Sequence, residues 1–203
     1  MSGRGNGAPV EQPARFAFTP ENLAKAKATI AKYPTGRQAS AVLSLLYLAQ
    51  DQHDNWVPRA AMDAVAEMLA MAPIRVYEVA SFYSMFNLEP VGTHFLQICT
   101  TTPCWLRGSD AVVEACKKKL GIGIGETTPD KKFTLLEVEC VGACVNAPVI
   151  QVNNRDFYED LDGPSTEKLI DALSRGETPP AGSVTGRQGS APAGGPTTLT
   201  EVK

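Results

Sequence analysis

The sequence predicts an α+β protein in which an N-terminal helical domain precedes an α/β domain built on a four-stranded mixed sheet. In residues 18–90, apolar side chains recur at the three- and four-residue spacing of amphipathic helices. In residues 91–175, short apolar runs bounded by glycine, proline or asparagine alternate with two helical patterns. The two ends, 1–17 and 176–203, are rich in glycine and proline and poor in large apolar side chains, so we expect both to be extended.

Four helices are expected in the N-terminal domain. The first begins after Thr19, whose hydroxyl can cap a helix that has proline in its first turn, and ends near Tyr33. In the second, over 42–49, apolar side chains extend beyond a single stripe and predict burial on most sides. Two further helices are expected near 58–71 and 73–85.

A β-α-β unit opens the second domain. Residues 94–98 are apolar and read as a buried strand, and residues 133–139 read as a second strand. Between them, residues 109–120 have helical spacing, with Gly121 placed to end the helix. Two strands joined through a helix are normally parallel with a right-handed crossover. The loops that follow the two strands should therefore leave the same edge of the sheet.

A hairpin and a helix complete the predicted domain. Residues 148–152 and 155–159 form two strand candidates, and Asn153-Asn154 between them tolerates the positive φ of a tight turn. A final amphipathic helix follows Gly163-Pro164. The order β-α-β-β-β-α is analogous to a reduced thioredoxin-like fold.

Two pairs of cysteines lie on the loops that follow the predicted parallel strands. Cys99 and Cys104 are separated by four residues, and Cys140 and Cys144 by three. Four thiolates that converge from two loops can hold a [2Fe-2S] cluster, which takes two per iron. They can equally form a tetrahedral zinc site. The spacing alone supports a [2Fe-2S] cluster and a zinc site about equally.

Other roles for cysteine and histidine fit the sequence less well. Five cysteines in 203 residues without a secretory signal do not indicate a disulfide framework. Three residues between Cys140 and Cys144 exceed the two of an efficient dithiol motif. Cys116 falls on the core face of its helix and is expected to be a small buried hydrophobe. Neither His53 nor His94 lies in a paired motif, so we assign them no chemistry.

Three longer motifs contain the cysteine pairs or lie between them, namely Cys99-Thr-Thr-Thr-Pro-Cys-Trp-Leu-Arg-Gly-Ser109, Gly125-Glu-Thr-Thr-Pro129 and Glu139-Cys-Val-Gly-Ala-Cys-Val-Asn-Ala-Pro148. In these motifs the chain resembles the family of small iron–sulfur subunits, often called 24 kDa subunits, of NADH:quinone oxidoreductase (respiratory complex I), which are thioredoxin-like [2Fe-2S] ferredoxins. The resemblance covers residues 18–175.

The resemblance implies a cofactor, partners and a role. Cys99, Cys104, Cys140 and Cys144 would bind one [2Fe-2S] cluster. FMN and NADH would bind to a partner chain, and further iron–sulfur subunits would complete the complex. The chain would be an electron carrier within an oxidoreductase (translocase), exchanging single electrons with the partner's flavin, and we see no acid, base or nucleophile of its own for bond changes. The family also implies that the helical domain docks on neighbouring subunits.

Composition limits the class of partner. With 19 Lys plus Arg against 22 Asp plus Glu, the net charge is −3, and no basic stripe is present, so we expect no nucleic-acid binding. There is no apolar stretch of 18 residues, so direct membrane insertion is not expected. We expect a peripheral position on the cytoplasmic face of the bacterial inner membrane, or alternatively on the matrix side of the mitochondrial inner membrane. The C-terminal tail is expected to contact a partner.

Two alternative functions stay open at the level of sequence. An equivalent small subunit of an NAD-linked hydrogenase or formate dehydrogenase would carry the same cysteine pairs. A zinc-stabilised interaction module would use them without redox chemistry. Measuring whether the protein contains iron or zinc distinguishes an iron–sulfur protein from the zinc-stabilised module. The identity of the neighbouring subunit distinguishes complex I from a hydrogenase or formate dehydrogenase.

Overall fold

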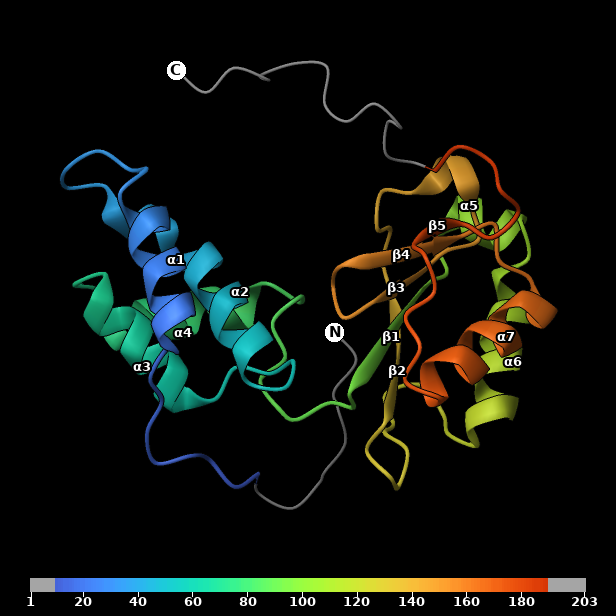
Figure 1. The fold of residues 1–203 in the computed structure, drawn as a ribbon, viewed down its shortest axis with the longest axis horizontal. Helices are drawn as coiled ribbons and strands as arrows, with labels where there is room; N and C mark the ends of the chain where they lie inside the picture. The colour runs from blue at the N-terminus through green and yellow to red at the C-terminus, as the bar shows by residue number, and fades with distance from the viewer. Residues whose placement is uncertain (1–9, 190–203) are drawn as a thin grey trace. The chain divides into compact units, whose positions relative to one another are not determined.

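The computed structural model describes residues 10–189. These residues form two compact units that divide between Val91 and Gly92. Figure 1 shows a unit made of helices, from blue to green, and a second unit that contains the sheet, from green to red. This agrees with the predicted α+β class, in which a helical domain precedes an α/β domain.

The first unit is built from four α-helices and a short 3₁₀ turn. Its elements are α1 (Pro20–Ile30), η1 (Gln38–Ala41), α2 (Val42–Gln52), α3 (Arg59–Met68) and α4 (Pro73–Phe82). The Thr19 hydroxyl accepts a hydrogen bond from the amide of Asn22 at 3.2 Å, so the predicted cap of α1 is confirmed. A common apolar core, which includes Leu45, Leu46 and Val65, holds the helices together.

Helices α3 and α4 are both shorter than the sequence predicts. Helix α3 gives way at Leu69 to a turn in which Ala70 has a positive φ of 51°. Helix α4 stops because Tyr83 adopts an extended backbone conformation. In the sequence, apolar residues at helical spacing continue past the C-terminal ends of both helices. The predicted helices were therefore too long, because the backbone leaves the helical conformation before this pattern ends.

The second unit contains a mixed sheet with the strand order β2-β1-β3-β4-β5. The strands are β1 (His94–Cys99), β2 (Phe133–Val138), β3 (Ile150–Val152), β4 (Asp156–Glu159) and β5 (Gly182–Ser183). Strands β1 and β2 are parallel, as predicted, and the β3–β4 hairpin is antiparallel. The prediction of four strands was wrong, because β5 adds a fifth strand parallel to β4.

The predicted hairpin turn is confirmed at Asn153-Asn154. Both asparagines have positive φ, 54° and 57°. The Asn153 side chain also accepts a hydrogen bond from the amide of Phe95 at 2.7 Å. The turn is therefore fixed to the neighbouring central strand.

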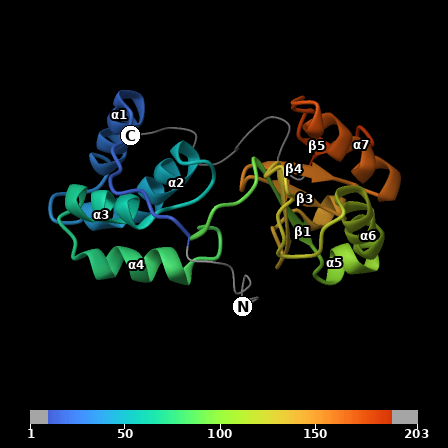
Figure 2. The ribbon, with the colours of Figure 1, turned by 90° about the horizontal axis from the view of Figure 1, so that it is seen from below.

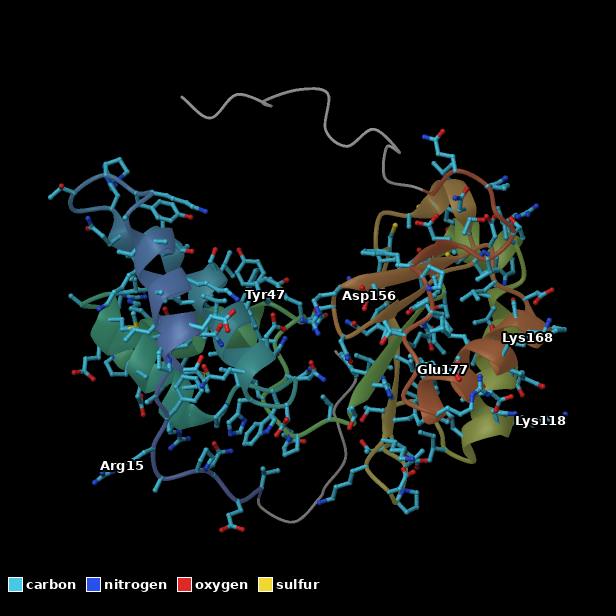
Figure 3. All side chains as sticks on the ribbon, viewed as in Figure 1. Arg15, Tyr47, Lys118, Asp156, Lys168 and Glu177 are labelled. Carbon is cyan, nitrogen blue, oxygen red and sulfur yellow. The ribbon has the colours of Figure 1, made fainter. Side chains whose placement is uncertain are left out.

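Helices α6 (Ser109–Leu120) and α7 (Gly163–Ser174) lie side by side against one face of the sheet (Figures 1 and 2). Their inner faces bury Val112, Cys116 and Ile170 in a core shared with Leu96 and other strand residues. Figure 3 shows Lys118 and Lys168 pointing away from this layer, on its exposed side. Because side chains alternate along a strand, Gln97 and Cys99 belong to the opposite face of β1.

Part of the predicted extended tail packs on its own domain. We call residues 179–189 the C-terminal strap. It begins where the Tyr158 hydroxyl donates a hydrogen bond to the carbonyl of Pro179 at 3.0 Å, and it continues into β5. Residues 190–203, also part of the predicted tail, lie outside the described residues, as do 1–9 of the predicted N-terminal extension. No helix within residues 10–189 has the length and apolar character needed to span a bilayer.

The close approach at Gly92 gives a test of this packing. A Cβ atom at Gly92 would lie 2.7 Å from the backbone carbon of Phe133, so Gly92→Ala should lower the free energy of unfolding by about 1–3 kcal/mol through overpacking. At Gly163 the nearest atom would lie 3.8 Å away, so Gly163→Ala should leave stability almost unchanged. Denaturant unfolding of both variants checks this, and equal stability of the two would contradict the packing described.

Candidate metal centre

Both cysteine pairs lie at one edge of the sheet, as the topology predicts. Strand β1 ends at Cys99, which is paired in register with Val138, the last residue of β2. Cys140 follows two residues later. Cys104 lies in the short helix α5 (Thr102–Leu106), and Cys144 opens the 3₁₀ turn η2 (Cys144–Asn146). The parallel strands thus deliver all four thiols to neighbouring loops.

The first pair is buried. Cys99 and Cys104 are each 1% exposed and belong to an apolar cluster with Ala143, Ala147 and Val149, into which the second loop therefore also reaches. The amide of Cys99 donates to the carbonyl of Val149 at 3.1 Å. These contacts hold the first pair through apolar packing and one backbone hydrogen bond.

The second pair is exposed. The sulfur atoms of Cys140 and Cys144 lie 3.3 Å apart, and all five cysteines of the chain are free thiols. Gly142, at a φ of 83°, turns the loop so that its amide donates to the Cys140 sulfur at 3.4 Å. A donor of this kind stabilises a thiolate and any negative charge that the sulfur shares with a metal.

Protonation of the thiols reflects how close the two loops are. Burial, together with the neighbouring Cys99 thiol, raises the pKa of Cys104 to about 12. Hydrogen bonding to Cys140, with a smaller effect of the charge on Cys99, raises the pKa of Cys144. The amide of Gly142 is the largest of the effects that lower the pKa of Cys140, and the Thr101 side chain from the first loop lowers it further. Residues of each loop thus shift the pKa of a thiol in the other loop.

The donor set fits a two-iron centre. A [2Fe-2S] cluster demands two cysteine thiolates for each of its two irons. Two close pairs on adjoining loops meet that demand, and free thiols are the chemistry that iron and sulfide require.

The comparison with known proteins decides the family. A sequence model described as thioredoxin-like [2Fe-2S] ferredoxin matches residues 26–174. The chain belongs to this family. The resemblance seen in the cysteine motifs is therefore confirmed, and with it the thioredoxin-like class of the fold.

Relatives of this ferredoxin come from a eukaryote and from bacteria. It is 51% identical over 186 residues to NADH dehydrogenase [ubiquinone] flavoprotein 2, mitochondrial, of Dictyostelium discoideum, in a match that covers 92% of this chain and 75% of the relative. It is 56% identical over 158 residues to a subunit of the NADH-quinone oxidoreductase of Rickettsia conorii, in a match that covers 78% of this chain and 94% of the relative.

The fold is also found in a solved hydrogenase structure. An NAD+-reducing [NiFe]-hydrogenase in the H2-reduced state matches with a TM-score of 0.58 and 20% sequence identity, over 66% of this chain. The ferredoxin spans only 23% of that hydrogenase chain. At this identity the match shows a common fold alone.

Exposed apolar side chains surround the cysteine loops of the ferredoxin. Trp105 and Leu106 of α5 are 55% and 70% exposed, and Val145 of η2 is 78% exposed. Arg107, the cation closest to the first pair in sequence, is exposed at the end of α5. Large apolar side chains exposed on both cysteine-bearing segments favour a site where another chain binds.

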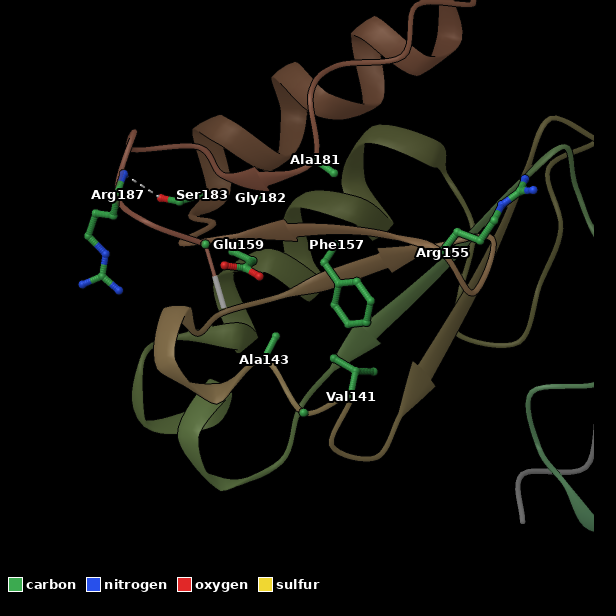
Figure 4. A pocket seen from close by; sticks show the side chains of 11 residues that line it. Val141, Ala143, Arg155, Phe157, Glu159, Ala181, Gly182, Ser183 and Arg187 are labelled. Carbon is green, nitrogen blue, oxygen red and sulfur yellow. Dashed lines mark hydrogen bonds between the residues drawn. The ribbon is translucent and has the colours of Figure 1, made fainter. Parts of the chain in front are cut away.

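A pocket of about 590 Å³ adjoins the second cysteine loop. Figure 4 shows Val141 and Ala143 on one side, Ala181 and Ser183 of the C-terminal strap on the other, and Phe157 between them. The sequence did not predict this pocket or the charged residues that line it, Arg155, Glu159 and Arg187. They come from segments far apart in the chain, and no local spacing predicts them.

The remaining cysteine and the histidines lie apart from the thiol pairs. Cys116 is fully buried in the core between α6 and the sheet, where burial raises its pKa to about 12. His94 packs against the ring of Phe133, and His53 against Trp56. None of the three shares a described contact with the cysteine loops.

Exposure predicts the order in which the thiols react. In the chain without a cluster, a maleimide should modify Cys140 and Cys144 before the buried Cys99, Cys104 and Cys116, because only an accessible sulfur can be attacked. Mass spectrometry of the resulting peptides measures this order. Labelling of Cys116 as fast as Cys140 would show that the core around α6 is open.

Proposed function

We propose that this ferredoxin is the electron-transfer subunit of an NADH:quinone oxidoreductase and carries one [2Fe-2S] cluster on Cys99, Cys104, Cys140 and Cys144. The observation that carries the proposal is the convergence of the two thiol pairs at one sheet edge in a chain of this family. Relatives above 50% identity are named as parts of NADH dehydrogenases or NADH-quinone oxidoreductases, which supports the choice of complex.

Each part of the site has a role in this proposal. When bound, a [2Fe-2S] cluster takes up and releases one electron at a time. The chain contributes four thiolates, the Gly142 amide as a hydrogen-bond donor to sulfur, and the apolar surroundings of Cys99 and Cys104. Hydrogen bonds to sulfur and exclusion of water both adjust a cluster potential.

The flavin and NADH sites are proposed to lie on a partner subunit, with further iron–sulfur subunits in the same complex. The exposed Trp105, Leu106 and Val145 beside the cysteine loops support a partner at this end of the domain, since association would remove their apolar surface from water. The helical domain, proposed to span 18–90, carries none of the cysteines and would dock on neighbouring subunits. The described part of the chain bears no membrane-spanning helix, so attachment would be peripheral.

The location of the chain would be that of the complex to which it is proposed to belong. We propose the cytoplasmic face of the bacterial inner membrane, with the matrix side of the mitochondrial inner membrane as the alternative. Relatives of comparable identity from Rickettsia and from a mitochondrion support both positions. A role in an NAD-linked hydrogenase has weaker support, because the hydrogenase match rests on 20% identity.

Metal analysis and electron paramagnetic resonance of the full chain test the proposed site. Anaerobically purified protein should contain about two irons and two sulfides per chain and give a [2Fe-2S] signal after reduction by dithionite. Cys99→Ser and Cys140→Ser should lose or strongly change that signal, because each removes a thiolate ligand. Cys116→Ala, which changes a buried cysteine outside the site, should retain it.

The same measurement separates the alternatives. Stoichiometric zinc without iron, in both aerobic and anaerobic preparations, would contradict the electron-transfer role and leave a structural metal module. A cluster that survives Cys99→Ser and Cys140→Ser without spectral change would contradict the ligand assignment.

A further inference from the structure

One buried asparagine connects the second cysteine loop to the end of the described chain. Asn146 lies two residues after Cys144 and is 1% exposed. Its side-chain amide donates to the Glu159 carboxylate at 2.7 Å and to the carbonyl of Gln188 at 2.7 Å. Its side-chain oxygen accepts from the guanidinium of Arg187. Two of these three partners belong to the C-terminal strap.

Arg187 makes further contacts at the same place. Its guanidinium donates to the carbonyl of Val145 at 3.1 Å and to the Asp160 carboxylate at 3.2 Å. The Asp160 carboxylate is 7% exposed, and the amide of Asp160 donates to the carbonyl of Asn146 at 2.7 Å. The planar guanidinium of Arg187 therefore joins the turn that contains Cys144 to the end of β4. A lysine ammonium, which is a single charge on a flexible stem, could not make these contacts with the same geometry.

The strap itself is held along its length. The Tyr158 hydroxyl binds Pro179, β5 pairs with β4, and the amide of Val184 donates to the carbonyl of Glu159 at 3.0 Å. Ser183 also donates to the Asp160 carboxylate. Arg187 and Gln188 thus reach Asn146 from the segment that follows β5, which these contacts fix to the end of β4.

We infer that the C-terminal strap latches the second cysteine loop, with Arg187 as the positioning residue for Cys144. The apolar contacts of this loop are made by Ala143 and Ala147, whereas Cys140, Cys144 and Val145 are exposed, so the rest of the loop depends on polar contacts. Without the strap, the buried Asn146 would lose two partners, and a buried polar group without partners favours opening of the loop to water. The consequence for cluster retention rests on the proposed function, whereas the latch itself does not.

Hydrogen exchange on the full chain without a cluster tests the latch directly. Arg187→Gln should accelerate exchange of the amides of Asn146, Ala147 and Asp160 by about tenfold, the effect of losing charge-assisted hydrogen bonds. Arg187→Lys, which keeps the charge but not the fork, should accelerate it by an intermediate factor. Exchange in β1 and β3 should be unchanged.

Arg175→Gln is the matched control. Arg175 is 59% exposed and makes a two-pronged contact with Glu177 at 2.7 and 2.9 Å, but it has no described contact with the cysteine loop. This variant should leave loop exchange unchanged. Unchanged exchange in Arg187→Gln, or acceleration spread equally over β1 and β3, would overturn the latch.

A second measurement uses the cluster-loaded chain. Loss of visible absorbance in the presence of a ferrous chelator should be about tenfold faster in Arg187→Gln than in the unchanged chain or in Arg175→Gln. Equal rates in all three would overturn the effect on retention. A chain that binds no iron would contradict the proposed function, while the exchange experiment would still decide whether the latch exists.

Discussion

The proposed metal centre depends on the parallel pairing of β1 with β2. Six residue pairs, from His94 with Phe133 to Cys99 with Val138, align the two strands so that their following loops begin at the same level. A shift by one residue would turn the apolar side chains of a strand away from α6 and α7, so burial fixes the register. The same burial that stabilises the sheet therefore places the two thiol pairs.

The two loops are held by different forces. The first loop is held by apolar packing around Cys99 and Cys104, which excludes water from two of the four thiols. The second loop buries Ala143 and Ala147 in the same cluster but keeps its two thiols exposed, and hydrogen bonds at Gly142 and Asn146 hold the remainder of it. Such a loop can receive iron and sulfide from outside and meet a partner's surface, but it needs polar contacts to keep one geometry.

Local sequence was sufficient for the two strands and the connecting helix that bring the cysteine loops together. Short bounded apolar runs predicted β1 and β2, helical spacing predicted α6, and turn chemistry predicted the Asn153-Asn154 hairpin. The helix α5 was missed because it has only five residues and directly follows two threonines, although Pro103 in its first turn is a helix-start signal. Strand β5 has two residues and no period, and the contact of Arg187 with Asn146 joins distant segments, so neither leaves a local pattern.

Anomalous X-ray diffraction at the iron edge, on crystals of the anaerobically purified chain, tests the central claim most directly. The account predicts two iron peaks between the loops, one beside the sulfurs of Cys99 and Cys104 and the other beside those of Cys140 and Cys144. A single peak bound by all four sulfurs, strong at the zinc edge and absent at the iron edge, would contradict it.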